Sequence, residues 1–211
     1  MNKKKSYEIL NVLRLIIKNP KPELNFNNNF ELLIAVMLSA QTKDKYVNVV
    51  TEKLFKLYPD PYSLSKANLD DLINLIKNLG LANHKAKSLI ETSKIIHEEY
   101  NDIVPNDSKK LEKLPGVGRK TANVVLALGF NIPAMPVDTH LLKMAERLGY
   151  VKENSTPLQA EEAYKKYINK CDWIESHHLF LLFGRYFCTK IHPKCDECKL
   201  RIYCKYIKKQ V

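Results

Sequence analysis

Apolar residues recur three or four positions apart along most of the chain, which is the period of a helix that buries one face. Runs that alternate apolar and polar residues, as strands do, are missing. Helix breakers such as Pro105 and Gly80 separate the periodic stretches. The pattern predicts an all-α protein with helices near residues 5–18, 29–40, 43–57, 64–67, 69–78, 83–99, 107–113, 119–130, 138–148, 157–169 and 173–187.

Two irregular links, residues 19–21 and 131–137, contain prolines and are candidate domain boundaries. If both are boundaries, the middle of the chain forms one domain and its two ends pack together as another. No run approaches the roughly 18 apolar residues that span a bilayer. The first 20 residues are expected to form an amphipathic helix that is retained, because no signal-peptide cleavage site follows them. We therefore expect an intracellular protein whose cysteines are reduced.

The charge balance favours a polyanionic partner. The 34 Lys and Arg residues exceed the 23 Asp and Glu residues, which gives a formal net charge of +11. The excess is uneven, because residues 1–105 have 15 basic and 12 acidic side chains whereas residues 106–211 have 19 and 11. Such a balance favours nucleic acid first and an acidic membrane surface second.

Four cysteines near the C-terminus have the spacing C-x6-C-x2-C-x5-C, at Cys188, Cys195, Cys198 and Cys204. In a reducing compartment, four close thiols indicate metal or redox chemistry before disulfides. Zinc and a four-iron cluster both accept four thiolates, and the spacing favours iron–sulfur over zinc while leaving both open. Cys171 stands apart and is expected to be a small buried apolar residue.

Residues 111–126 read LEKLPGVGRKTANVVL, which predicts a helix, a tight hairpin and a second helix. We expect Gly116 and Gly118 to allow positive φ in the hairpin. Backbone N–H groups of the hairpin and of the second helix's first turn can bind a DNA phosphate without reading sequence. An ordinary helix–turn–helix corner is the alternative.

Lys120 lies in the first turn of that second helix, where the helix dipole and the neighbouring Arg119 disfavour a charged ammonium. A neutral lysine is a nucleophile that can form a Schiff base, although a solvated, phosphate-binding lysine is an equal alternative on this feature alone. Asp138, in Val137-Asp138-Thr139-His140, is expected to cap a helix and to serve as a catalytic carboxylate.

Together these motifs resemble the bacterial endonuclease III family of DNA glycosylase/AP lyases. The resemblance includes LPGVGRKTANVVL, VDTH, the four-cysteine pattern and ELNFNNNFELLIAVMLSAQT, and it covers nearly the whole chain. It implies a two-lobed helix–hairpin–helix DNA glycosylase fold, with a six-helix domain at 22–132 and a [4Fe–4S] cluster domain at 1–21 plus 133–211. The four cysteines would be the cluster ligands, which decides for iron–sulfur over zinc.

The resemblance also implies residue roles. Lys120 would be the nucleophile, Asp138 the carboxylate, and Gln41 and Leu81 would fill the space that an extruded nucleotide leaves in the duplex. The expected reaction removes oxidised or ring-saturated pyrimidines and cuts 3′ to the abasic site by β-elimination. Together with Gln41 and Leu81, the expected DNA contacts are Gly116, Gly118, Arg119, His140, Lys190 and Lys194.

The expected partner is double-stranded DNA with a damaged base or abasic site, bound by a monomer that is cytoplasmic and nucleoid-associated in a bacterial cell. An adenine glycosylase relative shares the hairpin and cluster but typically lacks the lysine and has a further C-terminal domain. A non-enzymatic helix–hairpin–helix module could use the hairpin and basic residues alone. A zinc-binding structural protein would be colourless rather than brown.

Overall fold

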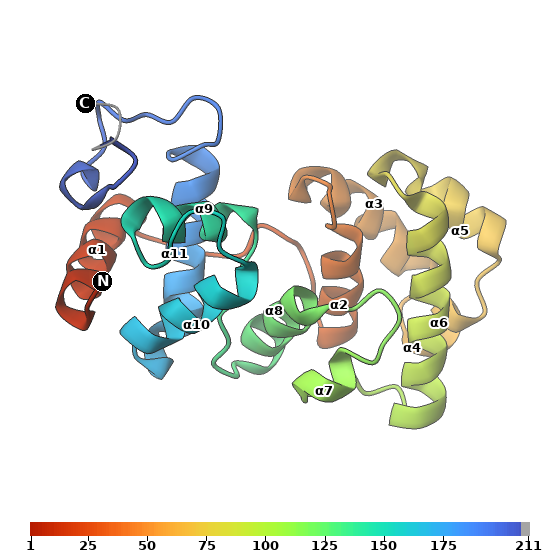
Figure 1. The fold of residues 1–211 in the computed structure, drawn as a ribbon. Helices are drawn as coiled ribbons and strands as arrows, with labels where there is room; N and C mark the ends of the chain where they lie inside the picture. Colours follow the sequence, from red (N-terminus) through yellow and green to blue (C-terminus); the bar gives the residue numbers. More distant parts are fainter. Residues whose placement is uncertain (208–211) are drawn as a thin grey trace. The chain divides into compact units, whose positions relative to one another are not determined.

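The computed structural model describes residues 1–207, and every regular element in that part of the chain is a helix (Figure 1). The all-α prediction is therefore confirmed for the described residues. The α-helices are α1 (Lys3–Ile16), α2 (Asn29–Leu38), α3 (Asp44–Leu57), α4 (Pro61–Ser65), α5 (Leu69–Ile76), α6 (Ala82–Tyr100), α7 (Ser108–Leu111), α8 (Arg119–Phe130), α9 (Thr139–Leu148), α10 (Pro157–Tyr167) and α11 (Trp173–Tyr186). Short 3₁₀ turns are η1 (Lys77–Leu79), η2 (Lys170–Asp172) and η3 (Arg201–Tyr203).

The chain divides into two compact units. A continuous unit comprises Pro22–Ile132, and a split unit combines Met1–Lys21 with the chain from Pro133 onward. Each has its own apolar core, as expected for domains that fold around separate clusters.

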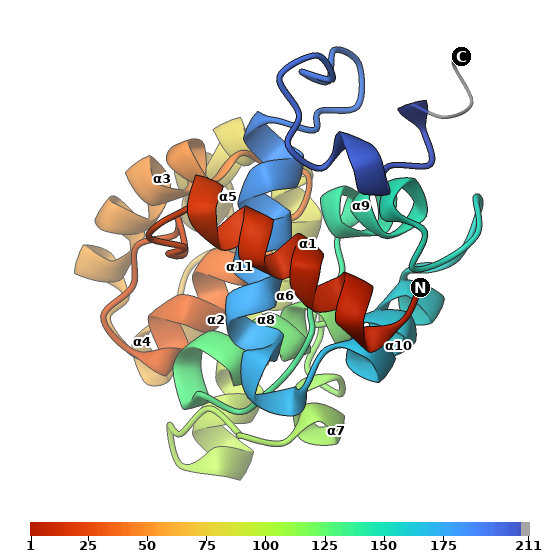
Figure 2. The same cartoon turned by 90° about the vertical axis from the view of Figure 1, so that its left-hand side faces the viewer.

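The split unit is built around α11, which packs against α9 and α1, and α9 also packs against α10 (Figure 2). Helix α1 contributes Ile9 and Leu13 to the core, as its amphipathic pattern predicts. Phe180 and Phe183 of α11 are buried in the same core. This packing places the start of α9, because α9 packs against α11. It also places the cysteine-rich segment, because that segment follows α11 directly in the chain.

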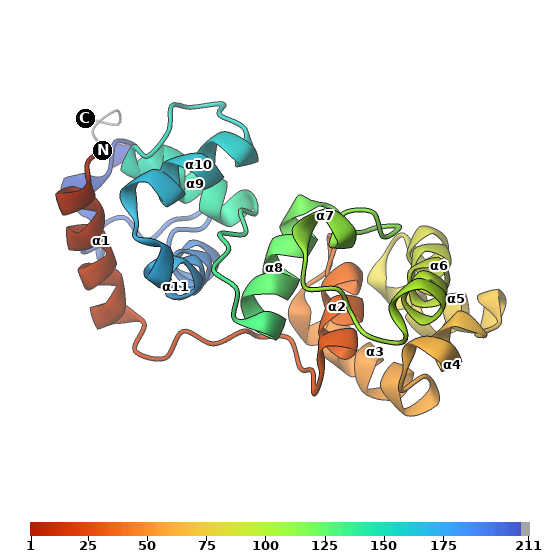
Figure 3. The same cartoon turned by 90° about the horizontal axis from the view of Figure 1, so that it is seen from below.

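The continuous unit contains α2–α8. Helix α2 is buried along almost its whole length and packs against α3, α6 and α8 (Figure 3). Helix α6 packs against α4 and α5, and α7 packs against α8. This unit has seven α-helices, one more than the family resemblance implies, and two of them, α4 and α7, are a single turn long. Among the described residues, no helix is long and apolar enough to cross a membrane.

One helix lies earlier than its sequence pattern predicts. The prediction of 64–67 is wrong, because α4 covers Pro61–Ser65. Asp60 caps it by accepting a hydrogen bond from Ser63 N at 2.7 Å, and Ser63 Oγ in turn accepts one from Asp60 N at 3.3 Å. Proline suits the first helical position, so Pro61 starts the helix rather than breaking it.

Candidate functional site

The hairpin between α7 and α8 is anchored by buried apolar residues, by a hydrogen bond within its turn and by one from α6. Leu111, Leu114 and Val117 are buried. The turn is closed by a bond from Val117 N to Leu114 O at 3.0 Å. The hydroxyl of Thr92, on α6, donates to Pro115 O at 2.9 Å. The predicted helix–hairpin–helix is thus formed, and its turn is fixed to α6.

The two hairpin glycines adopt different conformations. Gly116 has φ +77°, and a Cβ there would lie 2.9 Å from Ser88 Cβ. Gly118 has φ −91° and ψ 175°, so the expectation of positive φ is wrong for this residue. A Cβ on Gly118 would meet no atom within 4 Å. Gly116 is therefore required by the fold, whereas Gly118 leaves open space at the exposed start of α8.

Helix α8 buries one side and exposes its first turn. Ala122, Val125 and Leu126 are buried, as the apolar pattern predicts. Arg119 and Lys120 are exposed in the first turn. Its N-cap residue, Gly118, has no side chain with which to accept a hydrogen bond from that turn. The first turn of α8 is the positive end of the helix dipole, which suits an approaching anion.

Gln41 and Leu81 are exposed residues in left-handed backbone conformations, with φ 57° and 54°. Gln41 lies in the link between α2 and α3, and Leu81 is the N-cap residue of α6. The two links are joined, because the hydroxyl of Thr42 donates to Leu79 O at 2.5 Å. Both predicted residues therefore lie in the continuous unit, on links that are connected to each other.

Asp138 is the N-cap of α9, as predicted. Its Oδ1 accepts hydrogen bonds from His140 N at 2.8 Å and Leu141 N at 2.9 Å. Both bonds use one carboxylate oxygen, so Oδ2 takes no part in the cap. The carboxylate is thus held rigidly at the start of α9.

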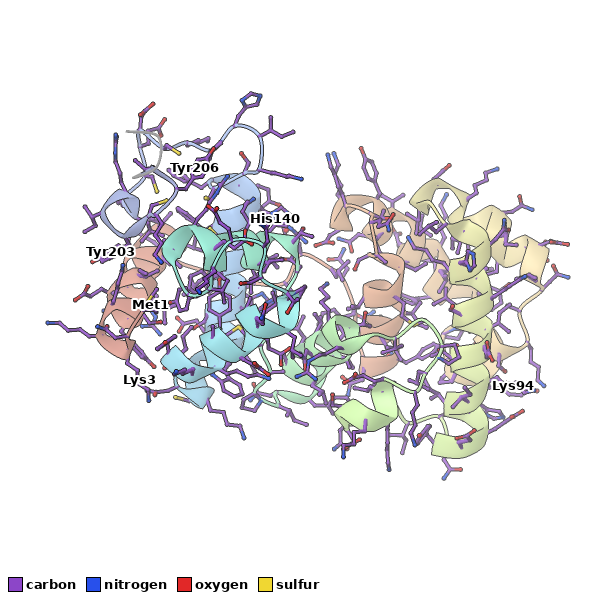
Figure 4. The ribbon with its side chains drawn as sticks, in the orientation of Figure 1. Met1, Lys3, Lys94, His140, Tyr203 and Tyr206 are labelled. Atoms are coloured by element: carbon purple, nitrogen blue, oxygen red, sulfur yellow. The ribbon has the colours of Figure 1, made fainter. Side chains whose placement is uncertain are left out.

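His140, labelled on α9 in Figure 4, is half-buried and has its Nδ1 3.2 Å from Gly184 O on α11. A Cβ on Gly184 would lie 3.1 Å from His140 Cβ, so the glycine permits this close approach of α9 and α11. Asp138 and His140 belong to the split unit and Lys120 to the continuous unit. That Lys120 and Asp138 act together stays a prediction.

The four cysteines surround one small cavity in the split unit. Cys188 follows α11, Cys195 and Cys198 form a turn, and Cys204 follows η3. All four line a space of about 260 Å³, part of it open to solvent. Burial, and then the negative charge of neighbouring thiolates, raises the pKa of Cys195. Within residues 1–207, no three His, Cys, Asp or Glu side chains are close enough together to hold a single metal ion.

A buried arginine that the sequence analysis did not single out ties the ends of this segment together. Arg147, on α9, donates to Cys188 Sγ at 3.0 Å and to Thr189 O at 3.0 Å. Its own carbonyl accepts from Lys205 N at 2.7 Å, and its guanidinium lies 4.4 Å from the ring centroid of Tyr206. Arg147 therefore joins residues 188–189, at the start of the cysteine-rich segment, to residues 205–206, which follow Cys204.

The structure tests the predicted burial of Cys171 but not the predicted DNA contacts of Lys190 and Lys194. Cys171 is exposed in η2, so the expectation of a buried apolar cysteine is wrong. Lys190 and Lys194 are exposed on the loop between Cys188 and Cys195. A bond from Lys194 N to Phe187 O at 3.2 Å closes that loop. Their role in DNA binding stays a prediction.

Comparisons with known proteins agree with these features. A family model described as "HhH-GPD superfamily base excision DNA repair protein" matches residues 34–170. The chain is 46% identical to endonuclease III of Rickettsia felis over 188 residues, which cover 89% of this chain and 88% of that protein. It is 41% identical to endonuclease III of Escherichia coli K12 over 209 residues, which cover 99% of both.

Comparison with solved structures also finds endonuclease III. The structure of a trapped endonuclease III–DNA covalent intermediate matches with a TM-score of 0.96 and 38% identity, covering 100% of this chain and 99% of that one. A non-covalent endonuclease III–DNA complex also matches with a TM-score of 0.96. The chain therefore belongs to the endonuclease III family, within the HhH-GPD superfamily of base excision DNA repair proteins.

Proposed function

We propose that this protein is a bifunctional DNA glycosylase and AP lyase of base excision repair. The observation that carries the proposal is Lys120, exposed in the first turn of α8 directly after an anchored hairpin, in a chain that matches endonuclease III over nearly its whole length. Its partner is double-stranded DNA with a damaged base or an abasic site, as the endonuclease III–DNA structures support.

The hairpin and the basic loop grip the DNA backbone. Gly116, Gly118 and Arg119 present the hairpin and the start of α8 to a phosphate, which the open space at Gly118 supports. Lys190 and Lys194 bind further phosphates, and His140 adds a contact at the start of α9. Such contacts orient the duplex without selecting its sequence.

The damaged nucleotide is extruded from the duplex, because its sugar cannot be attacked inside the stack. Gln41 and Leu81 fill the space that it leaves. Their exposure and their connected links support this role. We expect oxidised or ring-saturated pyrimidines as the bases removed.

The reaction follows from an amine nucleophile. The neutral amine of Lys120 forms a bond to the sugar C1′ while the C1′–N bond to the base breaks and the base leaves with the electron pair. Ring opening then gives a Schiff base between Lys120 and C1′. Loss of a C2′ proton lets the C3′–O bond break, so the strand is cut on the 3′ side. Water finally hydrolyses the Schiff base and restores the lysine.

Asp138 has two roles in base removal. Its carboxylate accepts a proton from the lysine ammonium and stabilises positive charge that develops on the sugar. The cap supports this role, because it fixes the carboxylate through Oδ1 and leaves Oδ2 for the reaction.

Cys188, Cys195, Cys198 and Cys204 hold a [4Fe–4S] cluster. Zinc bonded at about 2.3 Å to four thiolates would draw the sulfurs within ~4 Å of one another. A four-iron cluster would also take four thiolates, and it would need them arranged around a space large enough to hold it. The cavity that all four cysteines line supports the cluster. The cluster would hold in place the loop that contains Lys190 and Lys194, and it would take no part in making or breaking bonds.

We further propose that the protein acts as a monomer at the nucleoid of a bacterial cell.

Strand cleavage tests the proposal. Duplexes with a single abasic site, thymine glycol or 8-oxoguanine are incubated with the protein and separated on a denaturing gel. We expect nicks at the abasic site and at thymine glycol. Asp138→Asn keeps a helix cap, yet base release should fall by roughly 10²–10⁴-fold, while cleavage at a preformed abasic site suffers less. Binding without any nick at the abasic site would instead indicate a non-enzymatic DNA-binding module.

A further inference from the structure

Lys85, near the start of α6, is a buried ammonium that contacts oxygen atoms of two separate links. The residue is 8% exposed. Its Nζ donates to Leu38 O at 2.9 Å, to Ala40 O at 2.9 Å and to Leu79 O at 2.8 Å. Thr42 Oγ1 lies at 3.1 Å. One side chain therefore joins the link after α2 to the link before α6.

The groups around Lys85 explain how a charged side chain can be buried at this position. Burial lowers the pKa of Lys85. Leu38 is the last residue of α2 and Leu79 the last of η1, so the ammonium caps two helix ends and shares Leu79 O with the Thr42 hydroxyl. The negative end of the α2 dipole also favours a cation at this position. The oxygens around Lys85 thus require a buried donor with three N–H bonds.

The same two links contain the residues proposed to enter the duplex. Gln41 lies between Ala40 and Thr42, which both contact Lys85, and Leu81 lies two residues after Leu79. Positive φ at non-glycine residues otherwise occurs, in the described part of the chain, only at asparagine and aspartate, which tolerate it. Gln41 and Leu81 are neither, so their conformations are imposed by what surrounds them.

We propose that Lys85 is a positioning residue that holds residues 39–42 and 79–81 together as one wedge, with Gln41 and Leu81 preset for insertion. The proposal rests on the proposed function, since it assigns a support to the residues that fill the duplex. The advantage is preorganisation: the links are ordered before DNA arrives, so less binding energy is lost in ordering them. Thr42 completes the wedge, because its hydroxyl contacts Lys85 and donates to Leu79 O.

Binding to two duplexes tests the wedge. One duplex contains a tetrahydrofuran abasic analogue, which cannot be cleaved, and the other is undamaged. Lys85→Met keeps the length of the side chain but removes every donor. Its affinity for the analogue duplex should fall by roughly tenfold, while its affinity for the undamaged duplex, which depends on phosphate contacts, stays at the wild-type value. Lys87→Met, an exposed lysine on the same helix, is the matched control and should change neither.

A lysine that only stabilises the fold would lower the melting temperature without changing the ratio of the two affinities. All measurements are therefore made where circular dichroism shows full folding. If Lys85→Met does not fold, Thr42→Val tests the same wedge, because it removes one hydroxyl and keeps the side-chain shape. Thr42→Val should lower the ratio in the same direction by a smaller factor.

The outcomes separate the two proposals. A wild-type ratio in folded Lys85→Met, or in Thr42→Val if Lys85→Met does not fold, overturns the wedge alone. A wild-type protein that binds the two duplexes equally overturns the proposed function, and the wedge with it. Equal losses on both duplexes in folded Lys85→Met also contradict the wedge, because they show a general effect on DNA binding.

Discussion

Replacing Gly116 by alanine should destabilise the continuous unit through two separate effects. A left-handed φ of +77° costs an L-residue about 1–2 kcal/mol. The new Cβ would lie 2.9 Å from Ser88 Cβ and 3.3 Å from Met37 Cε, and overpacking of this kind costs about 1–3 kcal/mol. The free energy of unfolding should therefore fall by about 2–5 kcal/mol, measured by urea denaturation.

Two variants separate these effects. Ser88→Gly removes the atom that the new Cβ meets, so the Gly116→Ala loss measured in a Ser88→Gly background should be smaller than in wild type. Gly118→Ala is the matched control: its φ is −91° and no atom lies within 4 Å, so stability should change by less than about 1 kcal/mol. Its methyl group occupies the space proposed for a phosphate, so DNA affinity should fall instead. Equal stability losses for the two glycine variants would refute this reasoning.

The remaining predictions concern the cysteines, the basic loop and the tyrosines of the split unit. Serine at any of the four cavity cysteines should abolish iron content and brown colour, whereas Cys171→Ser should retain both; bleaching by Cys171→Ser would contradict the ligand assignment. Neutralising Lys190 or Lys194 should weaken binding to all duplexes alike and make the salt dependence shallower, and a changed base preference would contradict phosphate contact. Burial raises the pKa of Tyr150 and Tyr164, so the folded state keeps phenolic protons that the unfolded state loses above about pH 10; stability measured by urea denaturation should fall as pH rises through that region, and less so in Tyr164→Phe.

Most helices were predictable because their apolar spacing and caps are local signals. The cap at Asp138 and the buried side of α8 follow from a few neighbouring residues. The start of α4 also has a local signal, since Asp60-Pro61 followed by Ser63 is a capping pattern that places the helix earlier than its apolar residues do. Cys171 shows a different limit, because a short 3₁₀ turn exposes a residue type that is usually buried.

The candidate site was predictable only as far as its motifs are continuous in sequence. Lys85 was not found because its partners lie 6 to 47 positions away, and nothing local distinguishes it from the exposed Lys87. Arg147 likewise contacts Cys188, 41 positions later. The positive φ expected for Gly118 is wrong because a glycine can be needed for either of two reasons. It can allow a positive φ, or it can leave open space where a side chain would stand, and the sequence does not separate the two.

The central claim is that the amine of Lys120 is the nucleophile, and borohydride trapping tests it most directly. Borohydride reduces a Schiff base to a stable amine, so the protein should become covalently attached to a duplex that contains an abasic site. Mass spectrometry of the digested adduct should place the sugar fragment on Lys120, and Lys120→Gln should bind DNA yet give neither adduct nor strand cleavage. An adduct on any other residue, or cleavage that persists in Lys120→Gln, would contradict the mechanism.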